Sequence, residues 1–511
     1  MFYLVLNIIH NWHVLWNYDA GSIVSGEKTM KLFSEGKTYK LYQGTMLDMG
    51  EVIQPNSIDS IVTDPPYGLT SIVKRFGSEN SAPNQYGKDG SFARLTKGFM
   101  GKAWDGSGIE YNINTWQECY KALKPGGYLL AFGGSRTFYR IACAIEDAGF
   151  EIRDTIMWLY GSGFPKSMNI GLAIDNKNGV DSPVISSSDF PDIRKGKYEN
   201  NNGARIIVEQ KQAQNEWSGW GTALKPSFEP IIVARKPFKG SCVDNVVKYG
   251  TGGLNIDGCR VGNEIIKGGT APKMGAGDLG VCNFATVGAE RIERQDTVGR
   301  FPANTILTYD DTDFDEVCGG FPNTKNGVAV RHNSGGNTFG GNNKKPPMED
   351  LGYNDSGSAA RYFYCAKASK KDRDDGLDAF EEKVDCDRNP EAYSASTAFN
   401  RSARPKKNTH PTVKPTELMQ YLIRLVTPRG GTILDPFNGS GSTGKAAMYE
   451  NKERDAGYKY IGIDLEEEYL QISQARIEYV AGKSTAETPD INPGIIEKQG
   501  EQLSIFDYLG E

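Results

Sequence analysis

Short apolar runs alternate with amphipathic segments near both ends of the chain. In the first part, this pattern predicts strands at 39–44, 58–63, 128–132 and 152–160, with helices starting at 45 and spanning 116–123 and 136–148. In the second part, it predicts strands at 432–434 and 460–464, with helices spanning 416–426 and 466–479 and another starting at 445. Strands that alternate with helices indicate an α/β domain with a wound parallel sheet.

A long stretch without regular periodicity separates these two parts. From about residue 161 the chain is rich in Asn, Gly, Ser and charged residues, with only short apolar runs such as Pro230–Ala234 and Asn304–Leu307. This composition is typical of irregular structure. We therefore divide the chain into an extension, a first α/β half, an insert, a second α/β half and a tail, at residues 1–30, 31–165, 166–407, 408–482 and 483–511.

The strand predicted at 58–63 leads directly into the segment Asp64-Pro65-Pro66-Tyr67. Proline cannot continue a sheet ladder, so Asp64 is predicted at the carboxyl end of the strand, where α/β sheets bind ligands. Asp64 and the carbonyl of Pro65 can accept hydrogen bonds from an amino group, and the Tyr67 ring can stack on a planar base. The alternative is an ordinary turn, because turns are rich in Asp and Pro.

A glycine-rich segment, Asp435-Pro436-Phe437-Asn438-Gly439-Ser440-Gly441-Ser442-Thr443-Gly444, follows the strand predicted at 432–434. It runs into a helix, and the next strand ends at Asp464. A strand, a glycine turn, a helix and a strand with a terminal acid form a nucleoside-binding unit, in which the acid accepts from ribose hydroxyls.

Three ligands compete for this unit. A phosphate loop is disfavoured because Ala446 stands where the magnesium-binding Ser or Thr belongs. The spacing of Gly439, Gly441 and Gly444 keeps a dinucleotide site open. The carboxylate of Asp435 would repel pyrophosphate but suits a cationic cofactor such as S-adenosylmethionine.

Taken together, Asp64-Pro65-Pro66-Tyr67 upstream and Asp435–Thr443 downstream resemble the motifs of beta-class amino-group DNA methyltransferases of phage or mobile-element type. The segment His410–Pro415 also resembles the one that precedes the cofactor strand in that class. The resemblance covers about 38–165 and 408–480. It implies a Rossmann-like S-adenosylmethionine-dependent methyltransferase fold with circularly permuted motif order, and it makes the large insert at 166–407 a target-recognition region.

The resemblance also implies a role for each motif residue. The catalytic residues would be Asp64, Pro65, Pro66 and Tyr67. The cofactor-binding residues would be Asp435, Phe437, Gly439, Ser440, Gly441, Thr443 and Asp464, with Thr412 and Lys414 facing the cofactor carboxylate and Asp48 near its adenine. The implied reaction is transfer of a methyl group to the amino group of a base flipped out of duplex DNA, as in restriction–modification enzymes.

Asp rather than Ser before the paired prolines favours adenine N6 as the acceptor, with cytosine N4 as the alternative. Amino-group methyltransferases that act on RNA or on protein glutamine are related alternatives. A P-loop NTPase and a non-catalytic DNA-binding protein are alternatives of other classes.

Composition and charge restrict where DNA can bind and which cysteine-based sites the protein can form. The formal net charge is −6, so a DNA-binding surface must be local. Basic residues near the end of the insert are predicted to form it: Arg361, Lys367, Lys370, Lys371, Arg401, Arg404, Lys406 and Lys407. The eight cysteines are scattered, so we expect neither a metal site nor a disulfide framework but reduced cytosolic thiols. The resemblance implies that the protein lies in the cytoplasm of a bacterial or phage-infected cell.

The two ends of the chain carry weaker signals. The apolar stretch 1–16 is too short for a membrane span and lacks the basic start of a secretory signal, so we expect a loose arm or an upstream-start extension. Gln502–Phe506 resembles the short peptides that dock on the bacterial sliding clamp. Whether the protein dimerises is not readable from the sequence.

Overall fold

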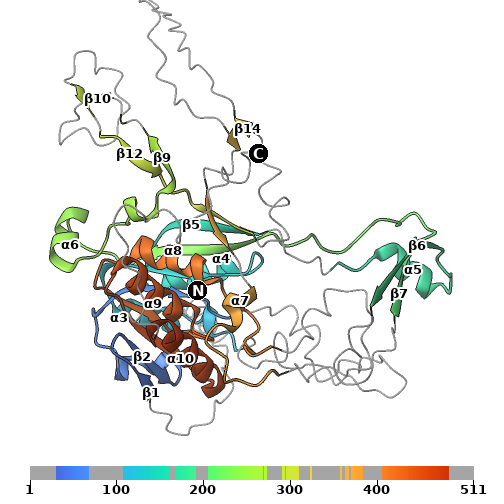
Figure 1. Cartoon of the computed structure of the whole chain (residues 1–511), viewed down its shortest axis with the longest axis horizontal. Helices are drawn as coiled ribbons and strands as arrows, with labels where there is room; N and C mark the ends of the chain where they lie inside the picture. Colours follow the sequence, from blue (N-terminus) through green and yellow to red (C-terminus); the bar gives the residue numbers. More distant parts are fainter. Residues whose placement is uncertain are drawn as a thin grey trace, which may run out of the picture.

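The computed structural model describes residues 30–67, 107–160, 167–191, 205–266, 268, 270–272, 291–293, 295–309, 323–324, 357–358, 363–367, 370–383 and 406–482. A ten-stranded sheet forms the centre of this part of the chain (Figure 1). Its strand order is β1 (Lys31–Glu35), β2 (Tyr39–Gln43), β18 (Lys459–Asp464), β17 (Thr432–Asp435), β3 (Ile58–Thr63), β4 (Leu123–Phe132), β8 (Phe228–Arg235), β5 (Glu151–Tyr160), β13 (Thr305–Tyr309) and β16 (Tyr364–Lys367).

The strands from β2 to β4 in this order are parallel, as are β5, β13 and β16. β17 lies directly beside β3, with Leu434 opposite Ile61. These two neighbours come from opposite ends of the chain, so the strand order reverses between them. In open α/β sheets such a reversal is where ligands bind.

Helices cover both faces of the sheet. One face carries α8 (Thr416–Val426), α9 (Ser442–Arg454) and α10 (Glu467–Gly482), whose apolar side chains pack with those of the strands into one core. The opposite face carries η1 (Met46–Glu51), α3 (Ile113–Ala122) and α4 (Phe138–Asp147) over a second core. The Rossmann-like α/β fold expected from the sequence is confirmed, and the predicted strands and helices lie within a few residues of their expected bounds.

The sheet differs from the prediction both in the strands it contains and in the direction of one of them. β8, β13 and β16 come from the region expected to be an irregular insert, yet they are strands of the central sheet. β8 also runs antiparallel to both of its neighbours, β4 and β5, so the sheet is mixed rather than wholly parallel. The run Pro230–Ala234 is buried because Ile231 and Val233 pack into one core and Ile232 and Ala234 into the other.

Other segments of the insert lie outside the sheet. Figure 1 shows α5 (Ile170–Lys177), β6 (Val184–Pro191) and β7 (Arg205–Lys211) grouped together beyond one side of the sheet. Further short elements are α6 (Cys242–Tyr249), η6 (Asp257–Cys259), the paired strands β9 (Val261–Ile266) and β12 (Thr297–Arg300), β10 (Thr270–Pro272) with β11 (Arg291–Glu293), and β14 (Asn323–Thr324) with β15 (Gly357–Ser358). Among the helices described, none has the length and apolarity needed to cross a membrane.

Candidate active site

The two predicted acids meet at the reversal of strand order. Asp435 is the last residue of β17, and Asp64 directly follows β3. The Thr63 hydroxyl donates to Asp435 Oδ1 at 2.6 Å, and the Thr443 hydroxyl donates to Asp435 Oδ2 at 2.7 Å. Burial raises the pKa of Asp435 to about 6, although both hydroxyls act to lower it. The Asp435 carboxylate therefore joins the two motifs across the β3–β17 pair.

The Asp64 carboxylate has one engaged oxygen and one open oxygen. Lys414 Nζ donates to Oδ2 at 2.5 Å. Oδ1 is buried and has no hydrogen-bond partner among the described residues. An open buried acceptor is costly, because it has lost its hydrogen bonds to water. It is therefore the atom of this motif that most needs a donor from a ligand.

Hydrogen bonds fix both the side chain and the backbone of Tyr67. Its hydroxyl donates to Glu229 Oε2 at 2.6 Å, and its carbonyl accepts from the Tyr111 hydroxyl at 3.1 Å. Glu229 is the second residue of β8, and because β8 is antiparallel, its start lies at the edge where β4 and β5 end. Pro65 and Pro66 are buried and Tyr67 is partly buried. Packing and hydrogen bonds therefore fix the position of the segment 64–67.

The glycine-rich turn is packed too closely to accept side chains. Gly439 and Gly441 have φ of +50° and +73°, a region that favours glycine. A Cβ at Gly439 would lie 2.8 Å from Nε2 of His410, and one at Gly441 would lie 2.2 Å from the Ser473 hydroxyl. The turn leads into α9, and free amides at a helix start suit an electron-rich ligand group.

Asp464 ends β18 beside this turn. Its carboxylate accepts from the backbone N–H groups of Gly439 at 2.7 Å and Glu466 at 2.9 Å, and most of the residue's surface is buried while a smaller part stays exposed. A carboxylate has about four acceptor positions, so capacity remains for ribose hydroxyls. Burial raises the pKa of Asp464 to about 7, although both N–H groups act to lower it. The cramped turn and this acid fit the nucleoside part of S-adenosylmethionine.

Cofactor affinity should therefore depend on pH. A ribose that donates to Asp464 favours the ionised carboxylate, so binding must expel its proton below pH about 7. The dissociation constant for S-adenosylmethionine should rise as pH falls from 8 to 6. Titration calorimetry checks this, and Asp464→Asn should bind more weakly at pH 8 with a flatter pH dependence. Equal pH dependence in both proteins would contradict this role of Asp464.

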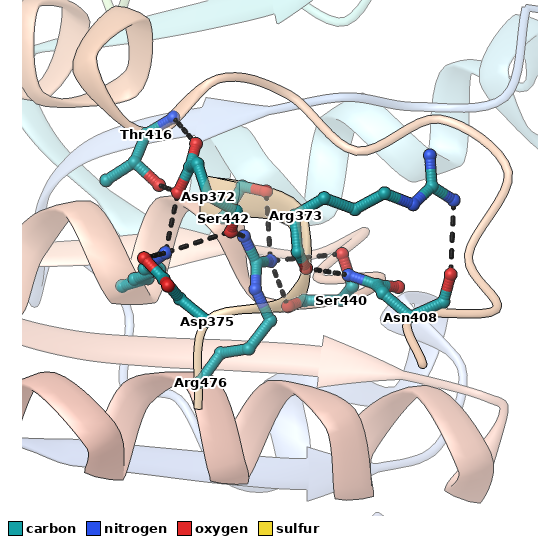
Figure 2. Close-up of polar contacts among 9 residues, drawn as sticks. Asp372, Arg373, Asp375, Asn408, Thr416, Ser440, Ser442 and Arg476 are labelled. Carbon is teal, nitrogen blue, oxygen red and sulfur yellow. Dashed lines mark hydrogen bonds and ion pairs between the residues drawn. The ribbon is translucent and has the colours of Figure 1, made fainter. Parts of the chain in front are cut away.

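A short helix from the insert, α7 (Lys370–Asp374), is linked to the glycine-rich turn through Arg476 (Figure 2). Asp372 Oδ2 accepts from the Thr416 N–H at 2.8 Å, and Oδ1 accepts from Lys445 Nζ at 2.6 Å. The buried Arg476 guanidinium donates to the Ser440 carbonyl at 2.7 Å and to the Asp372 carbonyl at 3.3 Å. α7 thus connects α8, α9 and α10 beside the glycine-rich turn.

The remaining predicted cofactor residues lie around the same edge. Phe437 packs near Trp116, with ring centroids 6.4 Å apart, and its N–H donates to Asp435. Thr412 is exposed, and Asp48 is partly buried on η1 beyond the end of β2. Lys414 contacts Asp64 rather than the glycine turn. Direct cofactor contacts of these residues stay predictions.

Only part of the predicted DNA-binding surface is described. Arg361, Arg401 and Arg404 lie outside the described residues, as does the clamp-like segment Gln502–Phe506. Lys367 lies on β16 and Lys370 and Lys371 lie on α7, while the Lys407 ammonium donates to the Asp378 carbonyl at 3.1 Å. The backbone of Lys406 bridges that of Lys383. Their binding to DNA stays a prediction.

Sequence reasoning missed three residues that matter here. Glu229 carries a weak signal, an acid directly before an apolar run. Asp372 stands in a run of mixed charges that is typical of a solvated surface, and Arg476 looks like an ordinary helix residue. Only the pairing of distant strands and helices brings these residues to the site.

Comparisons with known proteins identify the family. Residues 58–475 match the N6/N4 methyltransferase family described as DNA methylase. The type II methyltransferase M.HindIII of Haemophilus influenzae is 26% identical over 220 residues, which are 40% of this chain and 60% of that protein. M2.DpnII of Streptococcus pneumoniae is 46% identical over 69 residues, 14% of this chain and 24% of that protein.

The chain thus aligns with less than two thirds of the length of these relatives. Among solved structures, the PvuII DNA methyltransferase (cytosine-N4-specific) aligns with 90% of this chain and 91% of its own, at 12% identity and a TM-score of 0.37. Since the family match extends over most of the sequence, this chain belongs to the N6/N4 DNA methylase family.

Proposed function

We propose that this protein methylates the N6 amino group of adenine at specific sites in duplex DNA. The observation that carries the proposal is the open Oδ1 of Asp64, a buried acceptor at the reversal of strand order beside the cofactor turn. It is suited to an amino group that has left the base stack. The type II methyltransferases among its relatives support site-specific DNA as the substrate.

The family is S-adenosylmethionine-dependent, so this cofactor supplies an electrophilic methyl group. The chain's own residues prepare the acceptor. An exocyclic amino nitrogen is a weak nucleophile because its lone pair is delocalised into the ring. Asp64 Oδ1 and the Pro65 carbonyl accept from its two N–H groups, which favours a pyramidal nitrogen, while the Tyr67 ring stacks on the base.

Asp64 also provides a destination for a proton. S-adenosylmethionine held by the glycine-rich turn and Asp464 would supply the methyl group, and its sulfur would keep the electron pair of the bond to carbon that is lost when the amino nitrogen takes the methyl group. The nitrogen then carries one proton too many, and Asp64 Oδ1 is the adjacent base that takes it. Positioning and electrostatics account for the catalysis, without a covalent bond between enzyme and DNA.

The choice of adenine rests on the acid of Asp64-Pro65-Pro66-Tyr67, where a Ser-Pro-Pro form would favour cytosine N4. Nothing else in the described residues distinguishes the two bases. The assay must therefore distinguish adenine from cytosine. The same residues and the same chemistry serve either amino group.

The test is label transfer from tritiated S-adenosylmethionine to bacterial genomic DNA from methylation-deficient cells, followed by nucleoside analysis. We expect label in N6-methyladenine, and DNA already saturated by the enzyme should take no more. Label in N4-methylcytosine would keep the reaction and replace the base. No label in DNA, with cofactor still bound, would overturn the proposed substrate.

A further inference from the structure

Lys414 is an ammonium group buried between two carboxylates. Its Nζ lies 2.5 Å from Asp64 Oδ2 and 3.7 Å from Glu229 Oε2, and the whole residue is 6% exposed. Three aromatic rings surround it, with centroids 5.0 to 5.9 Å from Nζ: those of Phe132, Tyr67 and Trp158. A lysine in such an apolar enclosure stays charged only if anions and ring faces compensate for the lost water.

The pKa values of Lys414 and Asp64 depend on the charged groups beside them. Burial acts to lower the pKa of Lys414, but Asp64 and Glu229 outweigh it and raise that pKa above the ordinary lysine value. Burial raises the pKa of Asp64; Lys414 acts to lower it, and Glu229 acts to raise it further. Lys414 and Glu229 thus act on the Asp64 carboxyl in opposite directions.

Glu229 has a second contact with the same motif. Its Oε2 accepts from the Tyr67 hydroxyl at 2.6 Å, and its Oε1 lies 3.4 Å from the Tyr160 hydroxyl. It therefore connects the ring predicted to stack on the base with the lysine that holds Asp64. This connection comes from β8, a strand of the insert that lies between β4 and β5.

We propose that Lys414 and Glu229 are positioning residues of the methylation reaction: Lys414 holds Asp64 ionised through Oδ2 and leaves Oδ1 for the amino group, while Glu229 opposes that charge and fixes Tyr67. This inference rests on the proposed function and goes beyond it. It also gives Lys414 a task different from the cofactor-carboxylate contact expected from the sequence.

The proposal predicts shifts of opposite sign in one pH profile. Methyl transfer needs ionised Asp64, so the rate should be lost as pH falls through its pKa. This loss of rate is the acidic limb of the pH–rate profile. Without the Lys414 charge, the acidic limb should move to higher pH by about 1 to 3 units. Without the Glu229 charge, it should move to lower pH. Among the residues that the structure describes, the titratable or charged groups that face this carboxylate are Lys414, Glu229, Tyr67 and, more distantly, Asp435.

The experiment compares wild type, Lys414→Met and Glu229→Gln. Glutamine keeps an oxygen that can accept from the Tyr67 hydroxyl and removes only the charge. Turnover with tritiated S-adenosylmethionine and unmethylated genomic DNA is measured from pH 5.5 to 9.5, and calorimetry gives cofactor affinity at pH 8. Lys236→Met is the control, because this buried lysine donates to the Tyr120 and Leu123 carbonyls, away from Asp64.

We expect opposite shifts for the two variants, an unmoved limb for Lys236→Met, and cofactor affinity within about threefold of wild type in all three. A tenfold or greater loss of cofactor affinity in Lys414→Met with an unmoved limb would overturn the proposal and assign Lys414 to the cofactor. Shifts of the same sign would also overturn it. Failure of the proposed function differs from both, since wild type itself would then transfer no methyl group to DNA.

Discussion

Replacing Asp64 by alanine is expected to lower the rate of methyl transfer to DNA by about 10³- to 10⁴-fold, the usual effect of losing a group that both positions a reactant and accepts its proton. The glycine-rich turn, which we predict to bind the cofactor, contacts Asp435 and Asp464 rather than Asp64. Binding of S-adenosylmethionine should therefore survive. Single-turnover label transfer and calorimetry measure the two quantities separately.

The alanine variant alone is ambiguous, because it leaves Lys414 with Glu229 as its nearest carboxylate, at 3.7 Å. A buried charge that loses its partner destabilises a protein by about 3 to 5 kcal/mol. Asp64→Asn avoids much of this, because the amide keeps an oxygen for Lys414 and removes the charge. We expect Asp64→Asn to be nearly as inactive as Asp64→Ala but closer to wild type in stability.

Asp59 provides the matched control on the same strand. It is also buried and paired, with Lys124 Nζ at 2.6 Å and the Thr432 N–H at 2.8 Å, but it lies near the other end of β3. Asp59→Asn should lose stability while the folded fraction keeps its turnover. Turnover in Asp64→Asn equal to that in Asp59→Asn would refute a catalytic role for Asp64.

Strand ends were readable from the sequence because their signals are local. The apolar run before Asp64 stops at paired prolines, and the run before Asp435 stops at a proline and glycines. The sequence therefore predicts both acids at one edge of one sheet, and the structure places them at the ends of the neighbouring strands β3 and β17. Local chemistry also identified Asp464 as the end of the next strand.

The positions of Glu229 and Lys414 in the site could not be predicted, because they depend on which distant segments of the chain pair. β8 has an ordinary strand sequence, but nothing local says that it lies antiparallel between β4 and β5. Only that pairing brings Glu229 to Tyr67 and Lys414. In the same way, Lys414 sits in a motif that resembles a cofactor segment, whereas the packing at the start of α8 brings its ammonium to Asp64.

Replacing Asp372 by alanine is expected to destabilise the protein by about 3 to 5 kcal/mol, the range for removing one partner from a buried ion pair. The Lys445 ammonium is fully buried and would keep the Asp372 carbonyl at 3.0 Å, with the Asp375 carboxylate at 3.4 Å as its remaining counter-charge. The Thr416 N–H and hydroxyl would lose their acceptor as well. Chemical denaturation of the full chain measures the loss.

The same substitution should weaken cofactor binding without touching the cofactor. Arg476 holds the Ser440 carbonyl of the glycine turn and the Asp372 carbonyl of α7, so a displaced α7 loosens the turn (Figure 2). Asp378 is the control from the same segment, since its side chain is 97% exposed. Asp378→Ala should change stability by no more than about 0.5 kcal/mol and leave cofactor affinity as in wild type.

The two measurements together decide what α7 does. If Asp372→Ala loses stability and S-adenosylmethionine affinity while Asp378→Ala loses neither, this part of the insert belongs to the cofactor-binding core. If Asp372→Ala unfolds more easily but binds cofactor as tightly as wild type in its folded state, α7 only stabilises the fold. Equal stability of the two variants would mean that Lys445 finds its counter-charge in Asp375, which directly follows α7.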